Sequence, residues 1–282
     1  MRIDAHVHFW QPACEFDNRP IADEAAYRRD YMPEHLMPSL DACSIDGVIL
    51  VQTCPQTAET DWLLDLAADE PRVFGVTAWV DLDVPRCDFE SLAARPKVVG
   101  IRAQLRRIAD PAFIERPNVV ANLCGALAAG LNVTILAEAR HYLHVASVLP
   151  RLPRGPVTLN HLGLPFPDVE RSTWRTAMRT FARRADFNVQ LSGLPFLYGD
   201  AWQQDHARAL LDDALAIFGP DRLMFASDWP MMLRFATYEA WVHAAEAFMA
   251  KRGLSSRQQE AILAENVRRA NPRMQIPVTH VQ

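Results

Sequence analysis

The sequence lacks the features that mark membrane and secreted proteins. No apolar run reaches the roughly 18 residues that a bilayer-spanning helix needs. The first residues do not form a basic segment followed by a long apolar stretch, so we expect no signal peptide and a cytoplasmic chain. The net charge is −5, which disfavours nucleic acid and anionic membranes as partners.

Cysteines are few and follow no disulfide or metal-binding pattern. The chain has five of them, no pair has Cys-x-x-Cys spacing, and they stand at Cys14, Cys43, Cys54, Cys87 and Cys124. We therefore expect neither a disulfide framework nor a zinc knuckle. Reduced thiols in a cytoplasmic protein account for this distribution.

The chain also lacks a Gly-x-Gly-x-x-Gly motif after its first apolar run, which argues against the doubly wound, nucleotide-binding sheet that is the main alternative. It has instead eight short apolar runs, most of them separated by an amphipathic stretch. They are Arg2–Val7, Gly47–Val51, Val73–Val80, Lys97–Arg102, Leu131–Ala137, Pro156–Asn160, Phe187–Ser192 and Arg222–Ala226. This alternation over 282 residues predicts one (β/α)₈ TIM barrel domain covering residues 1–282.

Amphipathic segments between these runs predict the surrounding helices. They cover Thr60–Asp69, Val119–Ala129, His144–Leu149, Trp174–Arg184, Asp205–Phe218, Thr237–Lys251 and Ser256–Asn266. Ser255 and Ser256 are candidate N-caps of the last helix. Residues 11–37 predict a long irregular excursion over the barrel mouth, in which the prolines at 12, 20, 33 and 38 disfavour a continuous helix.

Polar residues follow several of the predicted strands. In a barrel the carboxyl ends of all strands surround one mouth. His6 and His8 lie two residues apart at the end of the first run, so their side chains point to the same side. His161 ends the sixth run and Asp228 follows the eighth. Since the first and last strands of a closed barrel are neighbours, we expect His6, His8 and Asp228 to meet.

Each of the remaining candidates has a structural alternative. Asp228 can act as a general base or metal ligand, or can cap the next helix. His161 can orient water or polarise a carbonyl, or can be satisfied by the backbone. Arg102 ends the fourth run, where a guanidinium can bind a substrate carboxylate or form a structural ion pair.

Residues nearer the rim are weaker candidates. Trp10 and Trp229 flank the two key motifs and can wall a pocket or pack in the core. Arg140, with Arg19 and Arg106, predicts a rim that favours anionic substrates.

The sequence resembles the amidohydrolase superfamily, in particular the branch of the sugar-lactone and 2-pyrone-4,6-dicarboxylate lactonases. The matching segments are 3–10 (IDAHVHFW), 46–52 (DGVILVQ), 59–67 (ETDWLLDLA), 79–82 (WVDL), 100–102 (GIR), 160–163 (NHLG), 191–194 (LSGL) and 227–230 (SDWP). The resemblance implies a distorted barrel that opens a small lactone. It places His6, His8, His161 and Asp228 in the active site and Arg102 on the substrate.

Departures from the family pattern bear on the metal. Arg102 stands where many amidohydrolases carry a carboxylated lysine, and the fifth run has no histidine, so we expect no binuclear centre. His6, His8 and Asp228 can hold one divalent ion such as zinc, with Glu138 as a further candidate ligand. Some lactonases of this branch are similar but metal-free, so both states stay open. Gln190 replaces a frequent lysine, which indicates an altered substrate preference.

The expected reaction is general-base attack of water on a lactone carbonyl. Asp228 takes the proton from water and returns it to the leaving alkoxide, while His6, His8 and His161, or an ion that they hold, polarise the carbonyl. Arg102, Trp10 and Arg140 would contact the substrate, which is an aldonolactone or a carboxylated lactone. A metal-dependent decarboxylase of the same superfamily is the alternative, followed by a binding protein on an inactive barrel. The oligomeric state stays open.

Overall fold

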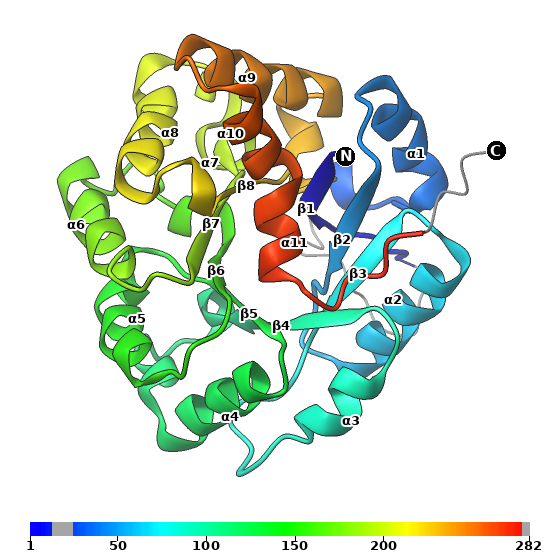
Figure 1. Ribbon diagram of the computed structural model, residues 1–282, viewed down its shortest axis with the longest axis vertical. Coiled ribbons are helices and arrows are strands. Elements are labelled where there is room, and N and C mark those ends of the chain that lie inside the picture. Colours follow the sequence, from blue (N-terminus) through cyan, green and yellow to red (C-terminus); the bar gives the residue numbers. More distant parts are fainter. Residues whose placement is uncertain (13–24, 278–282) are drawn as a thin grey trace.

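The strands form the barrel that the sequence predicts. The computed structural model describes residues 1–12 and 25–277. In this part of the chain, eight parallel strands form one sheet, in which each strand pairs with the next strand in the sequence (Figure 1). They are β1 (Ile3–Val7), β2 (Gly47–Val51), β3 (Val73–Ala78), β4 (Val98–Gln104), β5 (Asn132–Leu136), β6 (Val157–Leu159), β7 (Phe187–Leu191) and β8 (Leu223–Phe225). The predicted (β/α)₈ barrel is confirmed.

The first and last strands meet just beyond the end of β8. The amide of Asp228 donates to the carbonyl of His6 at 3.0 Å, and the amide of His8 donates to the carbonyl of Trp229 at 2.8 Å. The buried carboxylate of Asp4 strengthens this seam. Its Oδ1 accepts from the amides of His6 and Ser227 at 3.1 and 2.9 Å. The seam thus holds the histidine pair of β1 beside Asp228.

Strand register is irregular on one side of the barrel. The pairing shifts between Asp4 and Val7 of β1, between Val48 and Ile49 against β3, and between Val76 and Thr77 against β4. Such bulges redirect the side chains that follow them. The barrel is therefore distorted, as the resemblance implies, and the shift in β1 falls at the histidine pair.

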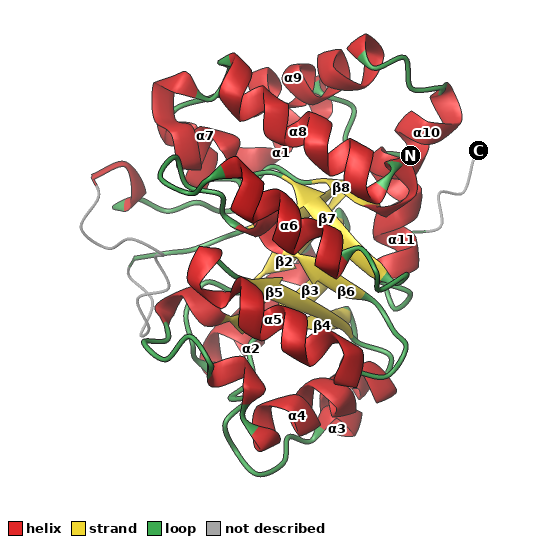
Figure 2. Ribbon diagram, turned by 90° about the vertical axis from the view of Figure 1, so that its left-hand side faces the viewer, coloured by secondary structure: helices red, strands yellow, loops and turns green. Residues whose placement is uncertain are grey.

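Helices surround the strands (Figure 2). They are α1 (Pro33–Ala42), α2 (Thr57–Asp69), α3 (Phe89–Ala94), α4 (Pro117–Ala128), α5 (Tyr142–Val148), α6 (Arg171–Phe181), α7 (Leu194–Tyr198), α8 (Asp205–Phe218), α9 (Tyr238–Lys251), α10 (Ser256–Glu260) and α11 (Asn266–Ala270). All seven predicted helical segments are present, and Ser255 caps α10 as expected. The sequence did not indicate α3 and α7, which are too short to show a helical period. No helix among the described residues has the length and apolar character that crossing a bilayer requires.

The structure corrects the expectation for the end of the excursion after β1. Residues 33–37 are helical, because Pro33 occupies the first turn of α1, where its missing N–H has no helical partner to lose. Pro38 lies inside α1 and removes a backbone hydrogen bond there. Burial of Leu36 and Leu40 against the core offsets that loss. Cys14 and Arg19 lie outside the described residues.

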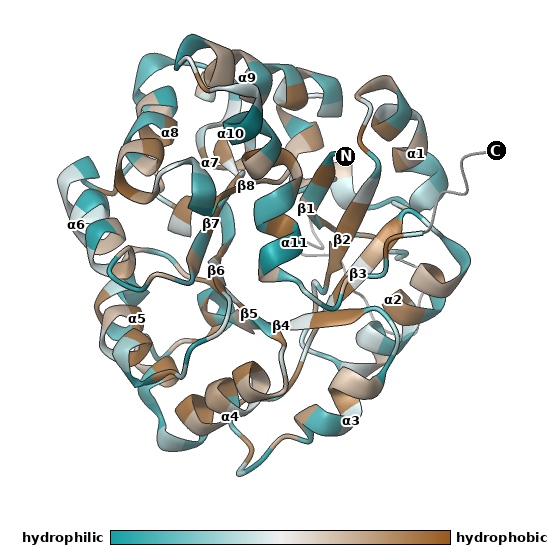
Figure 3. Cartoon of the chain, in the orientation of Figure 1, coloured by the Kyte–Doolittle hydropathy of each residue, from teal (hydrophilic) through white to brown (hydrophobic). Residues whose placement is uncertain are grey.

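Apolar side chains pack in two layers. One layer lies between strands and helices, and it contains residues such as Leu50 and Trp174. The other lies inside the amino-terminal end of the barrel, where Ile3 and Phe74 meet Val267 of α11. Figure 1 shows α11 across this end, and Figure 3 shows β2, β3 and β4 largely in brown among helices that alternate between brown and teal. Apolar side chains fill the amino-terminal end of the barrel, and the polar candidate residues lie at the carboxyl ends of the strands.

Candidate active site

A small cavity opens at the carboxyl ends of the strands. Its volume is about 290 Å³, at the low end for ligand sites. It is lined by His8, Thr53, Arg102, Gln104, Arg106, Arg107, Leu136, His161, Leu164, Phe196, Asp228 and Met231. The candidates predicted from four separate strand ends therefore share one cavity, and His6 lies directly behind His8.

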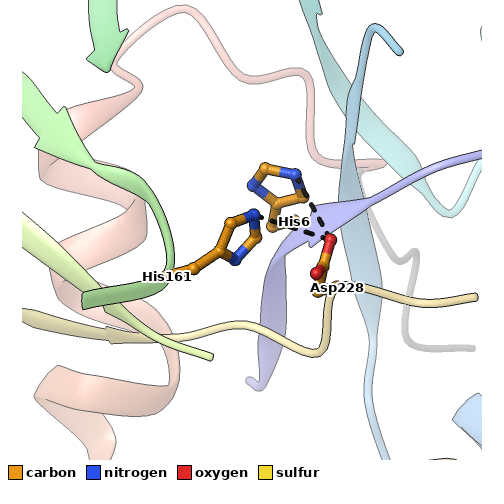
Figure 4. A group of neighbouring side chains, drawn as sticks. All are labelled: His6, His161 and Asp228. Carbon is orange, nitrogen blue, oxygen red and sulfur yellow. Dashed lines mark ion pairs between the residues drawn. The ribbon is translucent and has the colours of Figure 1, made fainter. Parts of the chain in front are cut away.

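Three imidazoles converge on the carboxylate of Asp228 (Figure 4 shows His6, His161 and Asp228). Oδ1 of Asp228 lies 3.4 Å from Nε2 of His8, 3.6 Å from Nε2 of His161 and 3.8 Å from Nε2 of His6. The two Nε2 atoms of His6 and His8 are 3.1 Å apart. All four side chains are buried. The predicted meeting of these residues is thus seen in the structure.

Hydrogen bonds fix the tautomers of the β1 histidines. Nε2 of Gln190 donates to the carbonyl of Ala5 at 3.0 Å, so its Oε1 faces Nδ1 of His6 at 2.9 Å. Nδ1 of His8 lies 2.6 Å from the carbonyl of Val51, which can only accept. The neutral form of each histidine therefore carries its proton on Nδ1 and directs the lone pair of Nε2 toward Asp228.

His161 has a strained backbone conformation and is closely packed against its neighbours. It adopts a φ of 49°, in the left-handed region that non-glycine residues rarely occupy. Its Nδ1 lies 2.8 Å from Oγ of Ser192. Gly193 is needed beside it, because its φ is +85° and a Cβ there would lie only 2.8 Å from Cβ of His161. The turn after β7 thus sets the position of this imidazole.

Two hydrogen bonds hold the guanidinium of Arg102 within the barrel, and one of its nitrogens stays available for a ligand. Its Nε donates to Oδ1 of Asn160 at 3.2 Å, and its Nη1 donates to the carbonyl of Gln52 at 2.9 Å. Asn160 in turn donates to Oε1 of Gln190 at 2.9 Å. The described residues offer the remaining nitrogen, Nη2, no acceptor. Arg102 can therefore donate a hydrogen bond to a ligand in the cavity.

Burial and charge set the protonation states. Burial lowers the pKa of His6 well below its usual value, with the charges of His161 and His8 acting in the same direction. Burial also lowers the pKa of His161 to about 4, although Asp228 opposes this. Burial would raise the pKa of Asp228, but His161, His8 and Arg102 together hold it below its usual value. Near neutral pH the site therefore combines neutral His6 and His161 with an ionised carboxylate.

These donors fit a single divalent ion. His6, His161 and Asp228 each offer a ligand atom within 4.8 Å of the others. The set predicted from the sequence, His6, His8 and Asp228, also satisfies this spacing, with separations of 3.1 to 3.8 Å. Two lone pairs facing a carboxylate oxygen repel one another unless positive charge lies between them. Neutral imidazoles oriented by a second hydrogen bond are typical metal ligands.

Other predicted residues lie away from these groups. Trp10 is fully buried, donates to the carbonyls of Tyr27 and Arg29, and packs on Tyr27 and Tyr31. It supports the segment after β1 and does not line the cavity. Trp229, which packs against Phe9 and Tyr31, also has a packing role.

Arg140 and Glu138 bind each other at the rim. Nε of Arg140 donates to Oε1 of Glu138 at 2.7 Å, and its other nitrogens donate to the carbonyls of Ala109 and Arg106. Neither residue lines the cavity, and Glu138 is not among the clustered ligand atoms. The structure therefore gives no support to the substrate role predicted for Arg140 or to Glu138 as a metal ligand.

Sequence reasoning missed several lining residues. Gln104 lies two residues after Arg102 on β4, so strand alternation could have found it. Arg107 and Phe196 come from short helical turns that carry no periodic signal. The orienting roles of Gln190 and Gly193 depend on contacts between strands that only the folded chain reveals.

Comparisons with known proteins agree with this geometry. The family model for amidohydrolases matches residues 3–270. An L-fucono-1,5-lactonase of Burkholderia ambifaria is 34% identical over 252 residues, covering 86% of this chain and 85% of that protein. An L-fucono-1,5-lactonase of Burkholderia multivorans is 31% identical over 277 residues, covering 93% of each. A crystal structure of an amidohydrolase from Burkholderia multivorans with bound zinc has a TM-score of 0.87 at 31% identity and covers 96% of this chain and 99% of that one.

Proposed function

This chain belongs to the amidohydrolase family, and we propose that it is a lactonase that opens a small sugar lactone by attack of water on the ring carbonyl. The observation that carries the proposal is the convergence of three imidazoles on Asp228, in a small cavity that also holds the buried guanidinium of Arg102. Lactonase relatives at 34% and 31% identity over most of the chain support the same reaction class.

The reaction replaces the bond between the carbonyl carbon and the ring oxygen with a bond between that carbon and the oxygen of water. The oxygen of water adds to the carbonyl carbon, and the resulting tetrahedral oxyanion collapses with cleavage of the bond between that carbon and the ring oxygen. The products are one carboxylate and one hydroxyl on the same chain. Asp228 accepts a proton from water during attack and passes it to the ring oxygen as that oxygen leaves. The carboxylic acid formed releases the net proton to solvent.

The remaining groups stabilise the oxyanion, orient the attacking water and contact the lactone ring. In the neutral imidazoles of His6 and His8, Nε2 accepts hydrogen bonds, so neither atom donates to the oxyanion in that form. Nη2 of Arg102 can donate to it and then hold the carboxylate product. His161 lies 3.6 Å from Asp228 and orients the carboxylate and the attacking water. Leu136, Leu164 and Phe196 provide an apolar wall against the ring.

One divalent ion, such as zinc, fits the imidazole and carboxylate donors of His6, His8, His161 and Asp228. When bound, it would act as a Lewis acid toward the carbonyl and would lower the pKa of the attacking water. Gln190, Val51 and Ser192 would serve as the groups that orient its histidine ligands.

The Asp228→Asn variant tests the proposal. The substituted amide keeps the shape of the carboxylate but cannot take a proton, so we expect kcat for L-fucono-1,5-lactone to fall at least roughly 100-fold. Ring opening is followed with a pH indicator, because each turnover releases one proton. Asp65→Asn, at an exposed position of α2, is the matched control and should keep full activity.

Two results would contradict this assignment. Full lactonase activity in Asp228→Asn, with an unchanged circular dichroism spectrum, would remove Asp228 from the mechanism. Carbon dioxide release from an aromatic carboxylate, without acid release from any lactone, would favour the decarboxylase.

A further inference from the structure

The β2 exit, which comprises residues 51–54, holds three side chains of the cavity through consecutive carbonyl groups. The carbonyls of residues 51, 52 and 53 accept, in that order, from Nδ1 of His8 at 2.6 Å, Nη1 of Arg102 at 2.9 Å and Nε2 of Gln104 at 3.4 Å. His8 follows β1, the other two lie on β4, and all three line the cavity. The position of the β2 exit therefore decides where these groups lie.

The carboxylate of Glu59 binds the N–H groups of the same segment. Both of its oxygens lie 2.9 Å from the amide nitrogen of Thr53, and Oε2 also accepts from the amide of Cys54 at 2.8 Å. The hydroxyl of Thr53 donates to Oε1 as well. One carboxylate thus fixes the backbone whose carbonyl groups bind the cavity residues.

The contacts of Glu59 stabilise the β2 exit and not its own helix. Glu59 is the third residue of α2, the position from which a capping-box carboxylate would accept from the amide of Gln56. That amide donates instead to the carbonyl of Cys54 at 3.0 Å. The carboxylate of Glu59 reaches past it to Thr53, which lines the cavity. Its hydrogen bonds are therefore made to the wall of the active site.

Glu59 is buried and takes part in no step of the proposed reaction. It is fully shielded from solvent and does not line the cavity, and a buried carboxylate is costly unless donors surround it. Burial raises the pKa of Glu59, and the donors of Thr53 and Cys54 oppose this rise. Burial lowers the pKa of Arg102 to about 10, an effect that the charges of Asp228 and Glu59 oppose. Glu59 therefore stabilises the charge of this guanidinium as well as its position.

We propose that Glu59 is a positioning residue of the active site, which fixes the β2 exit so that Arg102 faces the oxyanion and His8 faces Asp228. This inference rests on the proposed lactonase function. Glu59 touches neither the lactone nor the attacking water, and it acts through the side chains that the β2 exit holds. Because Arg102 binds the oxyanion in the transition state, loss of Glu59 should lower kcat with little effect on KM.

The Glu59→Gln variant tests this role. Glutamine has nearly the same size, but its amide nitrogen donates and cannot accept from the amides of Thr53 and Cys54. The β2 exit should therefore shift. Since a misplacement of about 1 Å can cost roughly 100-fold in rate, we expect kcat for L-fucono-1,5-lactone to fall roughly 10- to 100-fold. An unchanged kcat, or a loss confined to KM, would overturn the inference.

Asn122→Asp is the matched control. Asn122 of α4 is also buried. It accepts from the amide of Cys87 at 2.9 Å and donates to the carbonyls of residues 82 and 84 at 3.1 and 2.8 Å. That loop supplies none of the residues that line the cavity. The carboxylate of the variant cannot donate, so the fold loses comparable bonds while kcat should stay nearly unchanged. Equal losses of kcat in the two variants would overturn the inference.

Glu59→Asp covers the case in which Glu59→Gln does not fold. It keeps the charge, but its carboxylate is one methylene shorter and cannot reach both amides unless the β2 exit moves. We expect kcat to fall at least roughly threefold. An unchanged kcat in this variant would overturn the inference.

A double-mutant cycle shows whether Glu59 acts through Arg102. Glu59→Gln is measured alone and together with Arg102→Gln. If the two residues act in one network, Glu59→Gln should cost at least roughly threefold less in kcat once Arg102 is replaced. Losses that simply multiply in the double variant would mean that Glu59 acts independently of Arg102, and would overturn the inference.

A spectroscopic measurement separates this inference from the proposed function. If no lactone is hydrolysed, including L-fucono-1,5-lactone, the lactonase proposal fails. The magnetic resonance signal of the Nδ1 proton of His8, in protein with isotope-labelled histidine, still reports the position of the β2 exit. Glu59→Gln should move this signal toward that of a weaker hydrogen bond and speed its exchange with solvent, whereas Asn122→Asp should leave it unchanged. An unchanged signal in Glu59→Gln would overturn the inference whatever the outcome of the activity assay.

Discussion

Replacing Gly193 by alanine should move His161 and slow the reaction. A Cβ on residue 193 would lie 2.8 Å from Cβ of His161, so one of the two must shift by several tenths of an ångström to reach an ordinary contact. Misplacement of a reacting group by about 1 Å can cost roughly 100-fold in rate. We expect kcat for a hydrolysed lactone to fall roughly 10- to 100-fold. The left-handed φ of +85° should add a loss of about 1–2 kcal/mol in the free energy of unfolding.

Gly130 supplies a matched control. Its φ is +74°, but an added Cβ would meet no atom within 4 Å. Gly130→Ala should therefore show a similar backbone cost in urea denaturation and unchanged lactone hydrolysis. If Gly193→Ala retains the activity of Gly130→Ala, His161 is either not positioned by this contact or not needed for the reaction.

Three further predictions concern the protonation, orientation and metal loading of the site. Because burial lowers the pKa of His161 to about 4, kcat/KM should stay flat near neutral pH and fall as the pH approaches about 4; an acid limb centred at the ordinary histidine pKa would contradict this. Gln190→Leu removes the acceptor for Nδ1 of His6 and should lower kcat roughly 10- to 100-fold, whereas Gln190→Glu keeps an acceptor and should lose less; equal losses would argue against the tautomer assignment. Dialysis against a chelator should remove one ion per chain, measured by mass spectrometry, and lower kcat until zinc is restored, whereas full activity in metal-free protein would show that the imidazoles act alone.

Much of the barrel could be predicted because its signals are local. Buried parallel strands are short and apolar throughout, so the eight runs coincide with β1 to β8 within a few residues. The misjudged part is the start of α1, where proline is a helix breaker in general but acceptable in the first turn. Short helices such as α3 and α7 are held by tertiary packing and give no periodic pattern.

The central site followed from one topological rule, whereas its surroundings did not. Because the strands of a barrel end around one mouth, His6, His8, His161, Asp228 and Arg102 could be placed together from sequence positions alone. The same rule says nothing about side-chain direction in loops. The sequence predicts Trp10 and Arg140 at the substrate; in the structure Trp10 packs in the core and Arg140 binds Glu138.

The hydrogen bonds beneath the cavity limit the chemistry that the site can perform. Val51 and Gln190 each accept from a histidine Nδ1, so the neutral forms of His8 and His6 present lone pairs at Nε2. These two Nε2 atoms lie 3.1 Å apart beside an ionised carboxylate, so their lone pairs create a strongly negative electrostatic potential there. The depressed pKa of His6 means that a proton does not neutralise it near neutral pH. The site is therefore built to receive positive charge from a ligand, either a divalent ion or the hydrogens of a water that is about to attack.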